Sequence, residues 1–255
     1  MKLLLDLYSP RSYSWLTTCF VCLFITIAPT ATAEYKKPKT TSAPDSSTTT
    51  STATRGGCIN STDSKLSLTA IAPYSHVGQT TSTHPTFSWF IPDSEYFPLE
   101  FHLEEYTAQR PKTVYKQKLV SKPGMMSLSL PQSSSGLTIG KKYRWKVVMR
   151  CTRYKAVVTM AEIEVVAPTS KLKTAFEQTS GIGRIVDLYS STGLWYDALE
   201  MTLSAADVHR IELQNQLIQE LASSETKSNS NRVQQQGNKL TKISDRLKSA
   251  KTLDN

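Results

Sequence analysis

The residue types that most often carry catalysis or bind metals are few in this sequence and far apart. The histidines are His76, His84, His102 and His209, and no two of them have the H-x3-5-H or H-E-x-x-H spacing of a zinc site. Serine is abundant, but no G-x-S-x-G motif marks a nucleophile, and Gly181-Ile182-Gly183 is too short for a phosphate-binding loop. The sequence therefore indicates no catalytic residue, no metal site and no cofactor, with an unrecognised hydrolase as a remote alternative.

One short stretch does place possible ligands together. Glu100, His102 and Glu104 alternate along a predicted strand, so they share one face of it and could hold a metal with help from elsewhere. In an immunoglobulin-like strand order, the neighbouring strands present residues that alternate in charge: Arg144, Lys146, Arg150, Glu162 and Glu164. Because rows of opposite charge on adjacent strands form cross-strand ion pairs, we expect a solvated ion-pair network here in preference to a metal site.

The formal net charge of +9 is unevenly distributed along the chain. Residues 58–222 hold 17 Lys and Arg against 15 Asp and Glu, whereas residues 223–255 hold 7 against 3. A nucleic-acid interface needs basic residues clustered on a folded surface. Since the excess lies towards the ends of the chain, we expect no nucleic-acid partner.

The beginning of the chain has the three parts of a secretory signal peptide. Lys2 and Arg11 precede an apolar run at residues 15–28, and Ala31-Thr32-Ala33 is a small-residue cleavage pattern. The apolar run is shorter than the roughly 20 residues of a spanning helix. We therefore expect residues 1–33 to be removed after Ala33, leaving a periplasmic, secreted or cell-surface chain without a transmembrane segment. The alternative is an uncleaved segment that anchors the chain in the membrane.

Removal of the signal peptide leaves two cysteines, Cys58 and Cys151. An even number of cysteines in an oxidising compartment favours a disulfide. We expect these two to form one, and the alternative is a pair of buried free thiols.

The mature chain divides by its composition and its apolar period. Residues 34–57 are rich in Ser, Thr and Pro and predict a disordered linker. Residues 58–168 hold seven short segments in which apolar and polar residues alternate, with Trp89 and Trp145 as expected core residues. This pattern predicts a mainly β fold, an immunoglobulin/fibronectin III-like antiparallel sandwich. The segments begin near Leu66, Pro85, Leu99, Val114, Met126, Tyr143 and Ala161.

A tyrosine corner supports the sandwich prediction. Leu137 and Gly140 lie six and three residues before Tyr143, which opens a predicted strand. In immunoglobulin-like domains the phenol hydroxyl of such a tyrosine bonds back to upstream backbone at a corner between the sheets.

From residue 169 the apolar period changes to 3.6. Residues 169–222 predict two to three helices: one over residues 171–178 capped by Ser170, one that ends at Gly193, and a third capped by Asp207. The spacing of Tyr189, Gly193, Trp195, Tyr196 and Ala198 resembles one tetratricopeptide-type hairpin. A single such unit does not fold alone, so we expect a helical cap on the sandwich. Residues 223–255 are polar and basic and predict a disordered tail, with a marginal helix near its end where Leu240, Ile243 and Leu247 form a weak apolar stripe.

An ordered series of short motifs resembles one family, the cyanobacterial domain of unknown function 928. The resemblance runs from about residue 55 to residue 221, and its motifs are individually weak but specific in their order. It implies an exported, immunoglobulin-like β domain from a cyanobacterium, and it brings no activity and no catalytic residues. The motifs are Arg55-Gly56-Gly57-Cys58, Leu68-Thr69-Ala70, His84-Pro85-Thr86-Phe87, Pro123-Gly124, Gly140-Lys141-Lys142-Tyr143-Arg144-Trp145 and Gly193-Leu194-Trp195-Tyr196-Asp197-Ala198-Leu199.

These observations together favour an exported, non-enzymatic binding or scaffold protein of the cell envelope. We expect an envelope or surface protein as the partner, and Trp195 and Tyr196, near the turn of the helical hairpin, as the partner surface. The alternative is a domain that binds envelope polysaccharide or cell wall.

Overall fold

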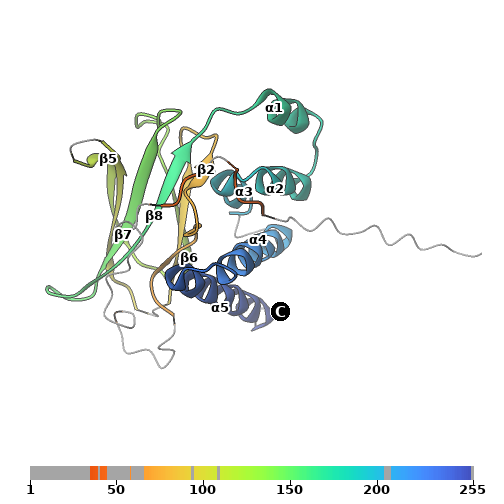
Figure 1. The fold of residues 1–255 in the computed structure, drawn as a ribbon. Helices are drawn as coiled ribbons and strands as arrows, with labels where there is room; N and C mark the ends of the chain where they lie inside the picture. Colours follow the sequence, from red (N-terminus) through yellow and green to blue (C-terminus); the bar gives the residue numbers. More distant parts are fainter. Residues whose placement is uncertain are drawn as a thin grey trace, which may run out of the picture. The chain divides into compact units, whose positions relative to one another are not determined.

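Eight strands form two sheets in the computed structural model, and helices follow them in the chain (Figure 1). The structure describes residues 35–39, 41–44, 58, 66–92, 95–107, 110–203 and 208–253. The predicted signal peptide with its cleavage after Ala33, most of the predicted linker and the predicted cap Asp207 lie outside the described residues. Every described residue belongs to one compact unit, Ala31–Asn255.

The strand order is β1-β3-β6 in the smaller sheet and β2-β8-β7-β4-β5 in the larger one. All seven predicted strands are present, and β2 is an additional one. The strands are β1 (Thr69–Ala70), β2 (Gly78–Thr80), β3 (Thr86–Ile91), β4 (Pro98–Glu105), β5 (Lys112–Val120), β6 (Gly124–Ser129), β7 (Lys142–Arg150) and β8 (Ala156–Val165).

One pairing departs from the predicted antiparallel arrangement. β2 lies parallel to β8, with Gly78 opposite Ile163 and Thr80 opposite Val165. The prediction of a purely antiparallel fold is therefore wrong at this edge. A three-residue strand shows no alternation of its own, and the direction of pairing depends on the path of the chain that precedes it. The fold is mainly β with a helical C-terminal part.

Aromatic side chains fill the space between the two sheets. Phe87 of β3 packs against Phe101 of β4 and Trp145 of β7, with ring centroids 5.1 and 5.6 Å apart. Trp89 and Trp145 are completely buried, as predicted for core residues. Alternation brings these rings to one face of each strand, so the same pattern that predicts the strands also predicts this core.

Five helices follow the strands, and four of them begin within residues 169–222, for which two to three were predicted. Thr169 caps the first of them, since the backbone N–H of Leu172 donates to its hydroxyl at 3.1 Å, so the predicted cap at Ser170 is one residue out. Gly193 ends the second helix with a φ of +85°, a conformation that glycine adopts without strain. The helices are α1 (Ser170–Glu177), α2 (Ile182–Ser191), α3 (Trp195–Met201), α4 (Val208–Thr226) and α5 (Asn231–Leu253).

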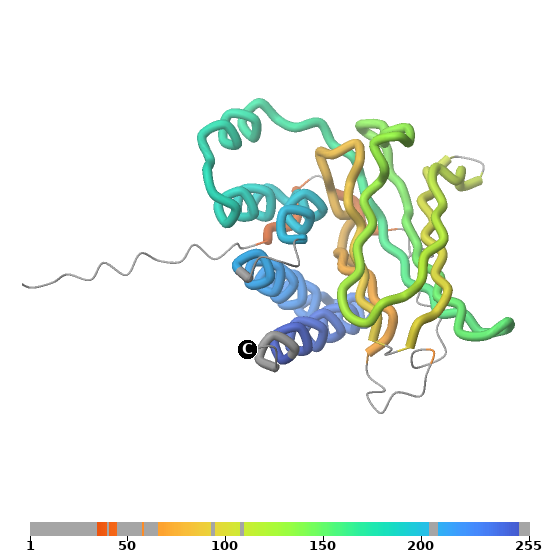
Figure 2. The backbone as a smooth tube through the Cα atoms, turned by 180° about the vertical axis from the view of Figure 1, so that it is seen from behind, coloured from red at the N-terminus to blue at the C-terminus, as the bar shows by residue number. Residues whose placement is uncertain are grey.

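The helices cover the outer face of the smaller sheet (Figures 1 and 2). All six residues of β3 are buried, although only alternate ones face the larger sheet. On the other face, the Thr86 hydroxyl donates to Glu200 of α3, and Arg246 of α5 lies over the Phe90 ring at 5.7 Å from its centroid. The helices therefore form a third layer, as expected for a helical cap.

The predicted disorder of residues 223–255 is wrong. α4 continues to Thr226, and α5 occupies residues 231–253. Leu240 and Ile243 are completely buried in the core, and the Gln236 amide donates to the carbonyl of Ala70 at 2.8 Å. The apolar stripe of this helix is narrow. Most of the helix stability must then come from tertiary packing, which local composition does not reveal.

Disorder was also predicted for residues 34–57, and the described part of that segment contradicts it. Tyr35 is only 6% exposed, and its ring packs edge-on against Trp195 with centroids 5.1 Å apart. Backbone bonds extend this attachment, from Lys36 N–H to the Ser190 carbonyl and from Val77 N–H to the Ser42 carbonyl. One aromatic anchor holds a segment whose average composition resembles a linker.

The described helices include none that is both long enough and apolar enough to cross a bilayer.

Candidate functional site

The predicted partner surface at Trp195 and Tyr196 is wrong, because both side chains are completely buried. The Trp195 indole donates to the Ile71 carbonyl at 3.0 Å. The Tyr196 hydroxyl donates to the Glu162 carbonyl at 3.0 Å and accepts from the Trp145 indole at 2.8 Å. These residues attach α3 to the sheets, and any partner surface on the helical part must use other residues.

The other predicted features lie where the sequence places them. Cys58 and Cys151 form a disulfide, as predicted. At the tyrosine corner, the backbone N–H of Thr138 donates to the Tyr143 hydroxyl at 2.9 Å, while Leu137 is buried and Gly140 has a φ of +82°. Both features fix the sandwich and leave no reactive group free.

The charged face of the larger sheet is the predicted ion-pair network. Glu104 accepts from Arg144 at 2.9 Å and from Lys146 at 2.6 Å. Glu100 binds Arg150, Lys116 and His102 at 2.9 to 3.1 Å. Hydrogen bonds from Lys116, Arg150 and His102, in that order of effect, hold the pKa of Glu100 well below its usual range. No group of three possible ligands suited to a metal ion is present among the described residues.

A buried chain of polar groups is the nearest approach to a catalytic arrangement. The Ser75 hydroxyl donates to Glu225 at 2.6 Å and is hydrogen-bonded to His76 Nδ1 at 2.9 Å. His76 Nε2 is in turn bonded to the Tyr35 hydroxyl at 2.6 Å. Glu225 also accepts the backbone N–H groups of Tyr74 and Ser75. Sequence reasoning missed this chain because Glu225 and Tyr35 fall in segments predicted to be disordered.

The surroundings of these hydrogen-bonded groups favour a structural role for them. His76 is 1% exposed, and burial, aided by the charge of Lys37, lowers its pKa to about 3. Burial also raises the pKa of Glu225. A general base needs a pKa near the working pH and access to a substrate. The described cavities include none that His76 or Ser75 lines. These hydrogen bonds join three parts of the protein: the N-terminal segment, the loop after β1, and α4.

A groove beneath α1 is the best candidate for a binding site; we refer to it as the α1 groove. It consists of two cavities of about 230 and 290 Å³ that share Thr81 and Leu172. Because they share two lining residues, the cavities adjoin, and together they reach the size range of ligand pockets, which begins at about 300 Å³. The first is lined by Thr81, Pro168, Leu172, Lys173, Phe176, Glu177 and Tyr189. Residues that line the second include Pro38, Lys39, Gln79, Val166, Thr192 and Leu194.

Three parts of the chain hold the walls of the α1 groove in place. Thr81, just after β2, donates its backbone N–H and its hydroxyl to Asp197 of α3, the hydroxyl at 2.6 Å. Burial raises the pKa of Asp197, and the bonds from Thr81 oppose that shift. Phe176 of α1 and Tyr189 of α2 form the outer wall, with ring centroids 6.0 Å apart. The groove is therefore a fixed feature of the junction between the sheet and the helices.

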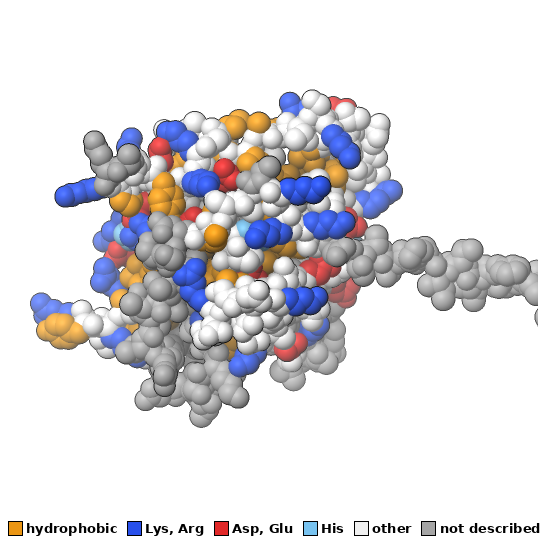
Figure 3. Space-filling view, in the orientation of Figure 1, with side chains coloured by type: hydrophobic (Ala, Val, Ile, Leu, Met, Phe, Trp, Pro, Cys, Tyr) orange, Lys and Arg blue, Asp and Glu red, His pale blue; other side chains and the backbone are white. Residues whose placement is uncertain are grey.

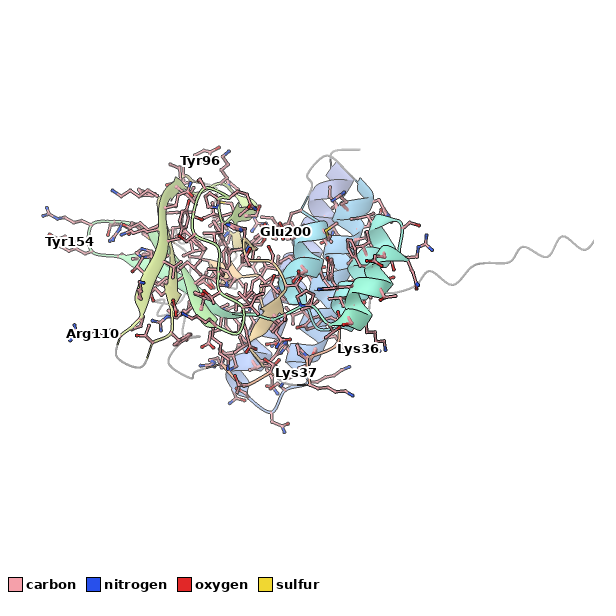
Figure 4. All side chains as sticks on the ribbon, turned by 90° about the horizontal axis from the view of Figure 1, so that it is seen from above. Lys36, Lys37, Tyr96, Arg110, Tyr154 and Glu200 are labelled. Carbon is pink, nitrogen blue, oxygen red and sulfur yellow. A yellow bond between two sulfur atoms is a disulfide. The ribbon has the colours of Figure 1, made fainter. Side chains whose placement is uncertain are left out.

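The surface around the α1 groove is basic. Lys39 and Lys173 line it, and Glu177 is the acidic residue among its lining side chains. Lys36, whose backbone N–H bonds to the Ser190 carbonyl of α2, is exposed beside the helices (Figure 4). The space-filling view shows Lys and Arg side chains gathered around apolar surface in this region (Figure 3). Such a groove can bind an apolar side chain flanked by acidic groups.

The sequence predicted α1 and α2 but not the α1 groove, because nothing local shows that α1 stands over the end of β8. Phe176 gives one retrospective signal. It is a large apolar residue that stays 43% exposed, against the rule for helices that bury their apolar side.

Comparison with known proteins gives a family and little more. A family model described as Domain of Unknown Function (DUF928) matches residues 50–231. No curated protein matches the chain. A solved structure of Astrotactin-2, described as a conserved vertebrate-specific and perforin-like membrane protein involved in neuronal development, aligns at 13% identity with a TM-score of 0.28. The alignment covers 69% of this chain and 38% of that one, and a similarity this low supports no argument.

Proposed function

This chain is a member of the DUF928 family, whose model matches well over half of it, and we propose that it is an exported, non-enzymatic binding protein of the cell envelope. Its partner is an envelope or surface protein that places an extended segment in the α1 groove. The segment carries an apolar side chain with acidic neighbours. A cyanobacterial source, as the resemblance implies, is part of the same proposal.

One observation carries this proposal, the α1 groove itself. Among its walls, Phe176 is 43% exposed, Leu172 is nearly buried, and Lys39 and Lys173 supply positive charge on both cavities. An apolar side chain of the partner would be buried between Leu172 and Phe176, while its carboxylates would meet the lysines. Charge complementarity of this kind selects a partner more than it adds affinity.

Two features support export. The predicted signal peptide provides the route, and the disulfide between Cys58 and Cys151 is typical of an oxidising compartment. The buried His76 and Glu225 stabilise the fold in this view, which leaves binding as the role of the surface.

The test is selection of peptides from a phage library of random 12-residue sequences on the purified full-length protein. We expect the enriched peptides to combine an aromatic or aliphatic residue with Asp or Glu, and to lose at least tenfold in affinity for Phe176→Ala and Lys173→Glu. The matched controls are Tyr154→Ala, at a side chain that is 91% exposed, and Lys118→Glu on β5. Enriched peptides that bind all four variants equally would show that the α1 groove is not the site.

Envelope polysaccharide is the second candidate ligand. The ring pair of the exposed Phe176 and the partly buried Tyr189 favours it, since the faces of aromatic rings pack against the apolar faces of sugars. Affinity electrophoresis in gels that contain peptidoglycan or exopolysaccharide separates the two candidates. Retardation that Phe176→Ala abolishes would favour the glycan, and migration unchanged by either polymer would exclude it.

A further inference from the structure

β6 is an edge strand, and its outward backbone groups can be identified. It pairs with β3 alone, in a register that sets Leu128 opposite Phe87 and Met126 opposite Trp89. The bond from Leu130 N–H to the Pro85 carbonyl continues this ladder. Because backbone groups in an antiparallel pair alternate in direction, Met126 and Leu128 point their N–H and C=O groups to β3. Those of Met125, Ser127 and Ser129 therefore point away from the sheet.

These outward groups have no partner within the described part of the chain, where no hydrogen bond to their N–H or C=O groups is found. The composition of the strand leaves the edge open as well. β6 has the sequence Gly-Met-Met-Ser-Leu-Ser, without a charge or a proline. β5, at the edge of the larger sheet, carries three lysines, which is a common protection against strand addition. The edge of β6 can therefore accept an added strand, whereas the lysines of β5 disfavour one.

A cavity of about 170 Å³ adjoins the open edge of β6. It touches Met125, Met126 and Ser127, together with Leu203 after α3 and Ile211 of α4. Side chains of successive strand residues point to opposite faces, so a cavity that touches both Met125 and Met126 lies at the edge itself. The lining offers room for an apolar side chain beside the backbone ladder. β6 lies at the front of the view from behind (Figure 2), and residues of α4 line the cavity beside its edge.

The cavity also distinguishes between possible occupants. A second copy of β6 could pair with this one in an antiparallel register centred on Ser127. Ser127 and Ser129 of that second copy would then lie next to the cavity. These two hydroxyls would leave the apolar part of the lining, formed by Met125, Met126, Leu203 and Ile211, uncovered, although Ser127, Thr202 and Gln214 also line the cavity. A foreign strand with an apolar residue at that position fits both the ladder and the cavity. This is the mode in which main-chain bonds give affinity and a side-chain pocket gives specificity.

We propose that the outer edge of β6 accepts an extended, uncharged segment of a partner protein as an added strand, with one apolar side chain in the cavity between β6 and α4. This surface is separate from the α1 groove and does not depend on it. A partner could use either surface alone.

The probe is a fluorescein-labelled octapeptide in which leucine alternates with threonine, titrated against the full-length protein by fluorescence anisotropy. Two matched peptides carry N-methyl groups, one on the amides along one edge of the strand and the other on the amides along the opposite edge. Each peptide can therefore donate backbone hydrogen bonds from one edge only. The protein variant is Ser127→Pro, which removes an outward donor without touching the ladder to β3. Its control is Ser127→Ala, which keeps the donor.

We expect the octapeptide to bind the native protein and Ser127→Ala equally, and Ser127→Pro at least tenfold more weakly. One of the two N-methylated peptides should lose at least tenfold and the other should bind normally. If Ser127→Pro unfolds, as judged by circular dichroism, the N-methylated pair decides alone. Equal binding of all three peptides would overturn the proposal. A concentration-dependent dimer that Ser127→Pro abolishes would overturn it as well, in favour of a second copy as the occupant.

Discussion

His76 shows how burial fixes the protonation state of one side chain. It is 1% exposed and bonded at both ring nitrogens, to Ser75 and to Tyr35. Burial first, and Lys37 second, lower its pKa from 6.5 to about 3. The ring is therefore neutral in the folded protein at neutral pH. Its role is to join the N-terminal segment to the loop after β1.

This neutral state predicts a pH dependence of stability. The folded pKa of His76 lies below the unfolded one, so unfolding takes up a proton between pH 6.5 and about 3. Stability contributed by neutral His76 is complete above pH 6.5 and is lost as the pH falls through that window, by up to about 5 kcal/mol. His76→Gln, which cannot ionise, should lose less stability than the native protein between pH 7 and pH 4.

Urea unfolding at several pH values measures this difference. The raised pKa of Glu225, caused by burial, gives a contribution of opposite sign, which the comparison of native protein and variant largely cancels. Parallel profiles for the native protein and His76→Gln would contradict the assignment of a neutral, buried His76.

At the scale of elements, α5 shows most clearly where packing overrides local composition. Its Leu240 is completely buried although the helix as a whole is polar. Truncation of a buried leucine usually costs about 2 to 5 kcal/mol of unfolding free energy. Leu240→Ala should therefore destabilise the whole unit by that amount in urea unfolding, whereas Lys242→Ala, at an exposed position on the same helix, should change it by less than about 0.5 kcal/mol. Equal effects would mean that α5 is not part of the core.

The elements that the sequence predicts are those with a long and regular period. Seven strands and the helices over residues 170–177, 182–191 and 208–226 follow from alternation or from a 3.6 period. β2 was missed because three residues carry no period, and the extent of α5 was missed because its apolar stripe is interrupted by Gln, Lys and Ser. In each case the missing information is tertiary, namely which surface the element meets.

The same limit applies to the candidate sites. The residues of α1 and α2 were visible, but the α1 groove exists only because the chain places Thr81 and Leu172 side by side. Trp195 and Tyr196 illustrate the converse error. Their position near a helical turn suggested exposure, while the sheets beneath them provide hydrogen-bond partners for both side chains. Aromatic residues with a polar group serve equally well in a core and on a surface.

At the scale of the whole described unit, distant segments are held together by a few specific bonds. Glu225 of α4 binds the loop at residues 74–75, Tyr35 anchors the N-terminal segment to His76, and Gln236 of α5 donates to the carbonyl of Ala70 in β1. The disulfide joins Cys58 to Cys151 across 93 positions of sequence. Each of these contacts closes a long loop, but the hydrogen bonds are lost on unfolding, whereas the disulfide persists and reduces the freedom of the unfolded chain.

The disulfide is the contact whose contribution can be tested most directly. A crosslink across 93 positions restricts the unfolded chain by about 4 to 5 kcal/mol in the loop-entropy model. Reduction with dithiothreitol should lower the unfolding free energy by that order, while the aromatic core around Trp145 and Phe87 keeps the reduced protein folded at low denaturant. The double variant Cys58→Ser with Cys151→Ser should match the reduced protein and should not respond to dithiothreitol. Urea unfolding with and without the reductant measures both. If the native protein unfolds at the same urea concentration in either condition, then Cys58 does not restrain the unfolded chain, and the stability resides in the sheets and helices alone.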